Sequence, residues 1–137
     1  MQIEKSRFIG AVAFRKNPDG KVSFALEYND DEKAYNFPRI RLDSQEKPLK
    51  ELNSWVGEVF GNYSLVWGYK DFVELFIYEN VREETTLFLF DVSGSDNTER
   101  ARENNIEFFD YAKACHLLLL KEQKDVLERA LSRIKAG

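Results

Sequence analysis

The sequence contains little of the two residue types from which many metal and redox sites are built. Its 137 residues include one cysteine, Cys115, and one histidine, His116. A single cysteine excludes a disulfide within these residues and a zinc site made of cysteines, and it favours a reducing setting. A single histidine likewise excludes a metal site with several histidines. We therefore expect a cytoplasmic protein.

An excess of positive charge and a long hydrophobic run are also absent. The 24 acidic and 20 basic residues are mixed along the chain, with a net charge of −4. This balance predicts no bulk binding to nucleic acid, although an anionic ligand in a local basic pocket stays compatible with it. The apolar run at Phe8–Phe14 contains Gly10 and is followed by Arg15, so it is too short and too polar to span a membrane. With 43% apolar residues, the chain can form a core without a disulfide or a metal.

No repeat, low-complexity segment or flexible linker divides the chain, so residues 1–137 are expected to form one domain. Aromatic and β-branched runs predict strands at Phe8–Phe14, Val22–Tyr28, Tyr35–Pro38, Tyr63–Trp67, Phe72–Tyr78 and Thr86–Val92. Turn signals at Asn17–Gly20 and Gly68–Lys70 predict one hairpin each. Helical patterns follow at Asp110–Leu120 and Asp125–Ile134. This order predicts an α+β fold in which helices pack on a mixed or mostly antiparallel sheet.

The clearest single element is a helix from about Pro48 to Phe60. Proline suits the first helical position, where its missing N–H has no partner to lose. Apolar residues recur at helical spacing on one face, namely Leu49, Leu52, Val56 and Val59. Gly61 suits the left-handed residue just past the helix.

A candidate site surrounds the start of this helix. The preceding loop and one helix face together carry two arginines, four acids and a tryptophan: Arg39, Arg41, Asp43, Glu46, Glu51, Trp55 and Glu58. Carboxylates so placed suit Mg²⁺, which prefers oxygen ligands and would activate water at a phosphorus centre. The arginines would bind phosphate oxygens, and the tryptophan would stack on a base. The structural alternative is that Glu51 and Glu58 are solvent-exposed acids opposite the buried stripe.

The same stretch resembles the box of the Nudix, or MutT-like, hydrolases, which is written G-x5-E-x7-R-E-U-x-E-E-x-G-U with U aliphatic. Phe37–Asp43 is similar to the F-P-K-G-x-x-D segment that often precedes this box, with Arg39 in place of lysine. Four of nine specified positions match without a gap: Glu46, Val56, Glu58 and Gly61. The resemblance implies a Nudix-like α/β/α sandwich with a mixed sheet. It also implies Mg²⁺ or Mn²⁺ as cofactor if the protein is active, and no cofactor otherwise.

The other five positions depart from the family pattern. The replacements are Ile40 for the opening glycine, Ser54 for the arginine, Trp55 and Val59 for two glutamates, and Asn62 for the closing aliphatic residue. In the family, three helical glutamates bind the metals, and only Glu58 remains of them. Trp55 would shrink or fill the metal pocket. Glu51, one turn earlier on the same face, is the candidate to replace a lost ligand.

Two further features bear on this resemblance. The segment Leu65–Leu87 matches the box equally often, but it would require a helix where Phe72–Tyr78 has a strand-like composition. Acids that a later segment could add to the site are Glu83, Glu84, Asp96 and Glu107.

Three interpretations stay open. The leading one is a degenerate Nudix-like domain that binds a nucleotide or a protein partner, including a second copy of itself, with weak or no hydrolysis. The second is a divergent hydrolase of dinucleoside polyphosphates, nucleoside triphosphates or ADP-ribose-type substrates. It would use Glu46, Glu51 and Glu58 for catalysis, with Glu51 and Glu58 on the metal. The third is an unrelated α+β domain whose match to the box is accidental.

Overall fold

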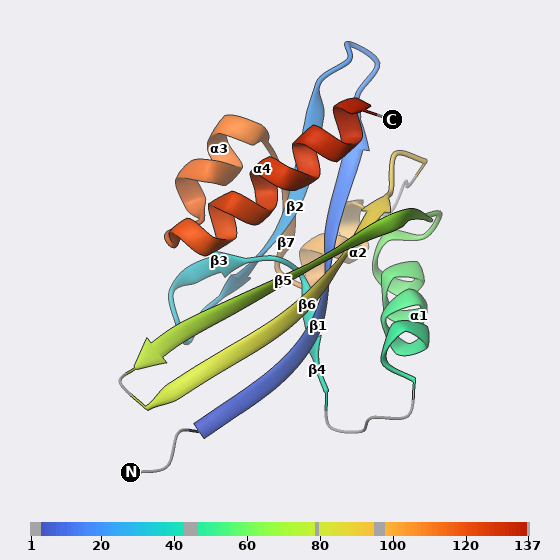
Figure 1. The fold of residues 1–137 in the computed structure, drawn as a ribbon. Helices are drawn as coiled ribbons and strands as arrows, with labels where there is room; N and C mark the ends of the chain where they lie inside the picture. The colour runs from blue at the N-terminus through green and yellow to red at the C-terminus, as the bar shows by residue number, and fades with distance from the viewer. Residues whose placement is uncertain (1–3, 43–46, 79, 95–97, 137) are drawn as a thin grey trace.

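One mixed β-sheet organises the chain in the computed structural model, which describes residues 4–42, 47–78, 80–94 and 98–136 (Figure 1). The strands are β1 (Glu4–Lys16), β2 (Val22–Asn29), β3 (Ala34–Asn36), β4 (Arg39–Arg41), β5 (Ser64–Tyr78), β6 (Val81–Asp91) and β7 (Ile106–Asp110). The helices are α1 (Pro48–Phe60), α2 (Thr98–Glu103), α3 (Tyr111–Leu117) and α4 (Lys121–Ala136). The sheet order is β3-β2-β1-β6-β5, with β4 paired to β1 and β7 paired to β2.

Strand β1 is the centre of this sheet. One edge pairs in parallel with β6 over Glu4–Phe14. The other edge is shared, because β4 pairs with Phe8–Gly10 and β2 pairs with Phe14–Lys16, both antiparallel. Strand β2 therefore leaves β1 beyond this short contact, and the sheet divides into two arms (Figure 1). The predicted hairpin and mixed sheet are confirmed.

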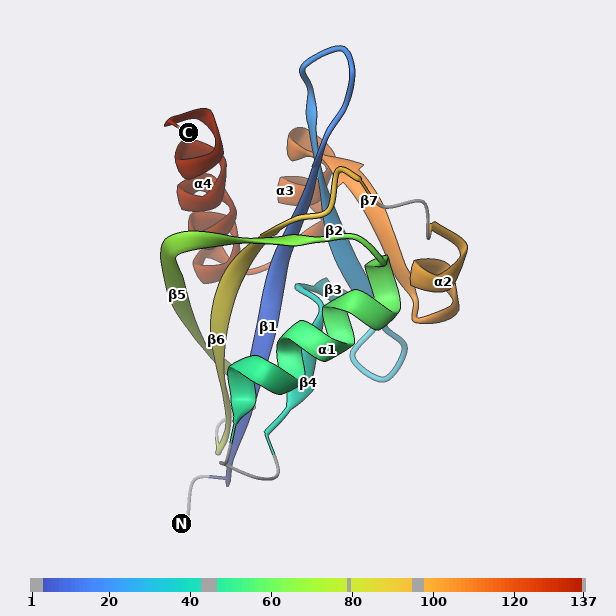
Figure 2. The ribbon, with the colours of Figure 1, turned by 90° about the vertical axis from the view of Figure 1, so that its right-hand side faces the viewer.

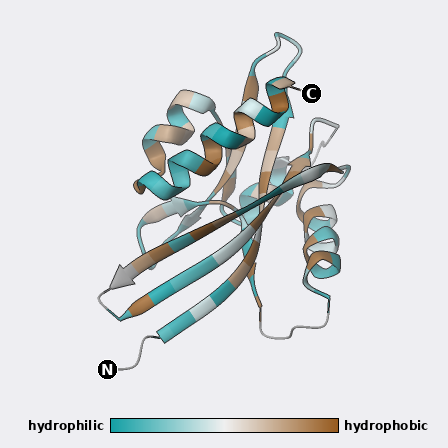
Figure 3. Cartoon of the chain, in the orientation of Figure 1, coloured by the Kyte–Doolittle hydropathy of each residue, from teal (hydrophilic) through white to brown (hydrophobic). Residues whose placement is uncertain are grey.

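Helices cover both faces of the sheet, as the alternation of side chains along β1 requires. Val12 and Phe14 belong to a core cluster with α3 and α4, whereas Ile9 and Ala11 belong to a second cluster with α1 and α2. Figure 2 shows α1 in front of β1 and β4, with α4 on the other side. Hydrophobic and hydrophilic residues alternate along α1 and α4 (Figure 3), as expected for helices that bury one side. The expected α/β/α sandwich is confirmed.

Helix α1 has the predicted bounds. Pro48 occupies the first turn, and the buried residues include Leu52, Val56 and Val59. Gly61 follows with φ of 83° and donates its N–H to the Gly57 carbonyl at 2.9 Å. Only a residue that tolerates positive φ closes the helix in this way. Among the residues that the structure describes, no helix has the length and apolar character needed to cross a membrane.

Strand β5 corrects one prediction. The expected pair Tyr63–Trp67 and Phe72–Tyr78 forms a single strand, not a hairpin. Gly68 has φ of 84°, and the register against β6 shifts between Leu65 and Lys70. A bulge of this kind absorbs extra residues while the strand continues. The turn signal therefore marked an irregularity within one strand.

The elements after β5 also differ in extent. Strand β6 begins at Val81 and not at Thr86, because its first residues pair with the start of β1. Strand β7 was missed, since it is short and is defined by its pairing with β2. It ends at Asp110, whose side chain accepts a hydrogen bond from the Lys113 N–H at 2.8 Å and caps α3. The predicted helix at Asp110–Leu120 is therefore shorter, and α4 begins at Lys121.

The close approach of β4 to β1 generates a stability prediction. A Cβ atom at Gly10 would lie 2.8 Å from the Pro38 carbonyl oxygen and 3.0 Å from Leu87 Cδ2. We expect Gly10→Ala to lower the free energy of unfolding by about 1–3 kcal/mol, because β4 must move. Urea denaturation measures this value. Gly94→Ala is the control, since its nearest neighbour would be 3.8 Å away, and a change of at most about 0.5 kcal/mol is expected. Equal stability of the Gly10 variant and the wild type would contradict the packing of β4 on Gly10.

Candidate functional site

Helix α1 presents a mixture of exposed acids and buried apolar residues at the predicted site positions. Glu51 and Glu58 are exposed. Trp55 is half-buried and packs against the core cluster beneath α1, and Val59 is only 2% exposed. The Arg100 guanidinium donates a hydrogen bond to the Glu58 backbone carbonyl at 2.6 Å, so α2 contacts the end of α1 through the main chain. Of the three positions that carry metal ligands in the family pattern, two are therefore apolar and packed.

The two exposed glutamates on α1, Glu51 and Glu58, do not by themselves supply a full ligand set for a divalent cation. Within the described part of the chain, no group of three or more acid, histidine or cysteine side chains lies close enough to hold a metal ion. Mg²⁺ requires an octahedral set of oxygen ligands, which one helical glutamate does not supply. The predicted acids Asp43, Glu46 and Asp96 lie outside the described residues, so the role assigned to Glu46 stays a prediction.

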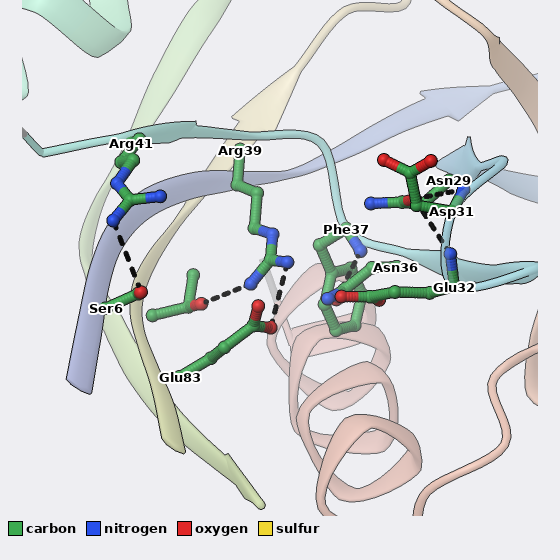
Figure 4. A network of polar contacts seen from close by, with 10 residues as sticks. Ser6, Asn29, Asp31, Glu32, Asn36, Phe37, Arg39, Arg41 and Glu83 are labelled. Carbon is green, nitrogen blue, oxygen red and sulfur yellow. Dashed lines mark hydrogen bonds and ion pairs between the residues drawn. The ribbon is translucent and has the colours of Figure 1, made fainter. Parts of the chain in front are cut away.

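The predicted arginines lie on the other face of the sheet. Ile40 packs with the cluster beneath α1, and strand alternation places its neighbours Arg39 and Arg41 on the opposite side. Figure 4 shows Arg39 pointing from β4 toward Glu83, and Arg41 pointing toward Ser6. The structure therefore does not bring the two arginines together with Glu51 and Glu58.

Arg39 is held by contacts within the chain. Its Nη2 lies 2.9 Å from Glu83 Oε1, and its Nη1 is 3.4 Å from Thr85 Oγ1. Its guanidinium carbon lies 3.8 Å from the centroid of the Phe8 ring. The Arg39 and Glu83 side chains are only 10% and 13% exposed. A guanidinium that is both paired and stacked has little capacity left for a phosphate.

The other candidate acids are also engaged or dispersed. Glu84 forms ion pairs with Lys5 at 2.7 Å and with Arg82 at 3.3 Å. The hydrogen bond from Lys5 lowers the pKa of the Glu84 carboxyl below its usual range. Glu107 is exposed on β7. Arg41 is exposed as well, and its Nη2 lies 3.5 Å from Ser6 Oγ.

A groove that the sequence did not predict lies between the two arms of the sheet. A cavity of about 330 Å³ is lined by residues of the β2–β3 turn, β3, β5, the α3–α4 connection and α4: Asp31, Glu32, Ala34, Tyr35, Asn36, Leu75, Phe76, Leu119, Leu120 and Gln123. A cavity of about 220 Å³ is lined by Phe8, Glu27, Asn29, Glu32, Asn36, Phe37, Arg39 and Glu83. The two cavities share Glu32 and Asn36, so we call them together the sheet groove. The acidic run within Asn29–Lys33 is the sequence signal that could have indicated it.

The sheet groove is acidic. It contains four carboxylates and one guanidinium, Arg39, which already pairs with Glu83. Burial raises the pKa of Glu27, although a backbone hydrogen bond and the charge of Arg39 oppose this. Burial, followed by the charge of Glu83, raises the pKa of Glu32. For both carboxyls, desolvation outweighs the stabilising charge of Arg39.

Comparison with known proteins identifies the fold. No protein-family model matches the sequence, and no curated protein matches it. The C. elegans Ap4A hydrolase, in a binary complex, is similar with a TM-score of 0.77 at 17% identity, over 96% of this chain and 98% of that chain. A Nudix hydrolase from M. smegmatis has a TM-score of 0.63 at 12% identity, over 94% of this chain and 85% of that chain. NrtR from Shewanella oneidensis, complexed with a 27mer DNA, has a TM-score of 0.61 at 10% identity, over 93% of this chain and 61% of its own.

At such identities the similarity shows the fold alone. The expected Nudix fold is confirmed. Proteins with this fold include both hydrolases and a protein bound to DNA, so the fold does not define the activity.

The buried pair of Arg39 and Glu83 generates the second prediction. We expect Arg39→Leu to lower the free energy of unfolding by roughly 3 kcal/mol at pH 7, because Glu83 keeps a largely buried charge without its partner. Replacing both residues by leucine should recover most of this loss. Urea denaturation measures all three values.

Arg41→Leu is the matched control, since Arg41 is on the same strand and face but exposed. We expect it to change the stability by at most about 0.5 kcal/mol. Equal effects of the Arg39 and Arg41 variants would contradict a structural role for Arg39.

Proposed function

We propose that this Nudix-fold chain is a binding domain with weak or no hydrolytic activity, whose ligand is a nucleotide or a protein partner. One observation carries the proposal: Trp55 and Val59 pack into the core where the family pattern has metal-binding glutamates. A carboxylate pair cannot form there without an acid replacing a buried apolar side chain. Glu58 alone does not supply the ligands that a hard cation needs.

The arginine contacts support the same proposal. A hydrolase of phosphate esters needs positive charge aimed at the transferring or leaving phosphate. Arg39 instead pairs with Glu83 and stacks on Phe8. The groove beside it holds further carboxylates, which disfavour a polyphosphate chain at short range. Cys115 is the single cysteine of the sequence, which favours a reducing, cytoplasmic setting for this binding role.

A hydrolysis panel tests the proposal. It contains nucleoside triphosphates, ADP-ribose, dinucleoside polyphosphates and capped RNA, each with Mg²⁺ and with Mn²⁺. We expect turnover below about 0.01 s⁻¹, a thousandfold under the median enzyme value of about 10 s⁻¹. Glu58→Gln, tested in parallel, should leave any residual rate unchanged. Faster turnover that depends on the metal and disappears in Glu58→Gln would instead establish a divergent hydrolase.

The packing at the former ligand position generates a separate prediction. We expect Val59→Glu to lower the free energy of unfolding by roughly 3 kcal/mol or more, because a carboxylate would be buried without a partner. Ser54→Glu adds the same charge at an exposed position of the same helix and should cost at most about 0.5 kcal/mol. Thermal and urea unfolding measure both values, each with and without about 5–10 mM Mg²⁺. This is roughly the millimolar range typical of weak cation sites. A stable Val59→Glu variant that Mg²⁺ stabilises further would show that the metal site is still accessible.

A further inference from the structure

The larger cavity of the sheet groove is lined in part by apolar side chains that are unusually exposed. Phe76 is 62% exposed and Leu119 is 68% exposed, and Leu120 beside it is 39% exposed. They come from β5 and from the α3–α4 connection, and all three line the larger cavity. Exposed apolar side chains gathered at a concave site are typical of surfaces that bind another molecule.

The smaller cavity, which we call the acidic end of the groove, has a different character. Glu27, Glu32 and Glu83 line the smaller cavity with Arg39. Figure 4 shows Glu32 and Glu83 on two sides of this region, with Arg39 directed to Glu83. Because both cavities contain Glu32 and Asn36, the larger cavity with its exposed apolar side chains is continuous with the acidic end.

We propose that the sheet groove binds a basic peptide segment of a partner protein. In this arrangement one arginine or lysine side chain extends to Glu27 and Glu32, and apolar side chains next to it cover Phe76, Leu119 and Leu120. This inference rests on the proposed binding role and specifies its partner. No bond is made or broken, so no metal or co-reactant is required.

Charge complementarity selects this occupant over a nucleotide. Four carboxylates face one guanidinium that is already paired, so a further cation is attracted and a polyphosphate is repelled. Guanidinium suits the site best, because its planar array of donors can bind carboxylates in bidentate pairs.

The exposed apolar side chains of the larger cavity favour a peptide over a free amine. A small amine held at the acidic end would leave Phe76 and Leu119 in water. A chain that continues out of the groove would cover them and gain roughly 25 cal/mol for each Å² of apolar surface removed from water. The partner segment is therefore expected to combine a basic residue with apolar neighbours.

The acidic end also implies a pH dependence with a definite sign. Glu27 faces Arg39, while Glu32 faces Glu83, Arg39 and Asp31. Partial desolvation in the groove raises the pKa of both carboxyls, so they take up protons at a higher pH than fully solvated glutamates do. A bound cation favours the ionised form. Affinity for the basic segment should therefore be full near neutral pH and fall as the pH drops through these raised values.

The test uses the full chain and pools of fluorescent decapeptides in fluorescence anisotropy. Each pool has a fixed central residue between randomised apolar positions, and the central residue is arginine, lysine, citrulline or glutamate. Citrulline matches arginine in shape but carries no charge. We expect the arginine pool to bind at least about tenfold more tightly than the citrulline pool, which corresponds to one paired charge. The glutamate pool should not bind.

Substitutions at two exposed groove residues test whether the peptide binds in the sheet groove. Glu32→Gln should weaken the arginine pool at least about fivefold and reduce the preference over citrulline, and Leu119→Ser should weaken both pools. Glu103→Gln, on α2, makes the same charge change as Glu32→Gln away from the groove lining and should have no effect. Because Glu32, Leu119 and Glu103 are exposed, all three variants should melt like the wild type.

Several results would overturn the inference. These are equal binding of the arginine and citrulline pools, full binding by Glu32→Gln, displacement of the peptide by equimolar agmatine, or binding of ATP in place of every peptide. The hydrolysis panel reports separately on the binding role. A hydrolytically inactive chain that ignores the basic pools would refute the peptide alone, whereas metal-dependent turnover lost in Glu58→Gln would refute the proposed function.

Discussion

The structure depends on how one strand edge is divided. Strand β6 occupies the whole of one edge of β1, in parallel register from Glu4 to Phe14. Two strands then compete for the other edge: β4 takes Phe8–Gly10, and β2 takes Phe14–Lys16. Since backbone hydrogen-bonding groups pair with one neighbour per edge, β2 has to separate from β1 after a few residues. The groove between the two arms of the sheet is the consequence, and Arg39 of β4 contributes to its lining. Gly10 makes this possible, because its missing side chain allows β4 to approach.

The distribution of charged side chains in this groove affects which ligands suit it. Arg39 enters from β4 and meets Glu83 from β6, with the Phe8 ring against the guanidinium. Burial makes this pairing necessary, since either group alone would be costly to remove from water. The pair uses the only guanidinium among the groove residues and leaves Glu27 and Glu32 with raised pKa values. A feature that stabilises the fold thus makes the same site unsuitable for phosphate and suitable for a cation.

Much of the local structure could be predicted because its signals are local. Helix α1 has its proline, its apolar stripe and its closing glycine within one short segment, and the predicted bounds are the observed ones. The hairpin of β1 and β2 likewise follows from the turn at Asn17–Gly20. Prediction failed where pairing with a distant segment decides the outcome. Strand β5 continues past Gly68 because β6 lies beside it, and β7 exists as a strand because β2 offers an edge.

The sequence by itself determined the bounds of α1, the hairpin of β1 and β2, the α+β class, the box spacing that pointed to the Nudix fold, and the loss of two helical glutamates. These follow from residue identity and spacing along the chain. Only the tertiary structure decided that Arg39 and Arg41 lie on the face opposite α1, that Glu83 is the partner of Arg39, and that an acidic groove exists. The face that a strand residue occupies depends on the register with its neighbours, and a buried ion pair depends on which strands meet. Neither the face of a strand residue nor the partner in a buried ion pair is encoded in the spacing of a single segment.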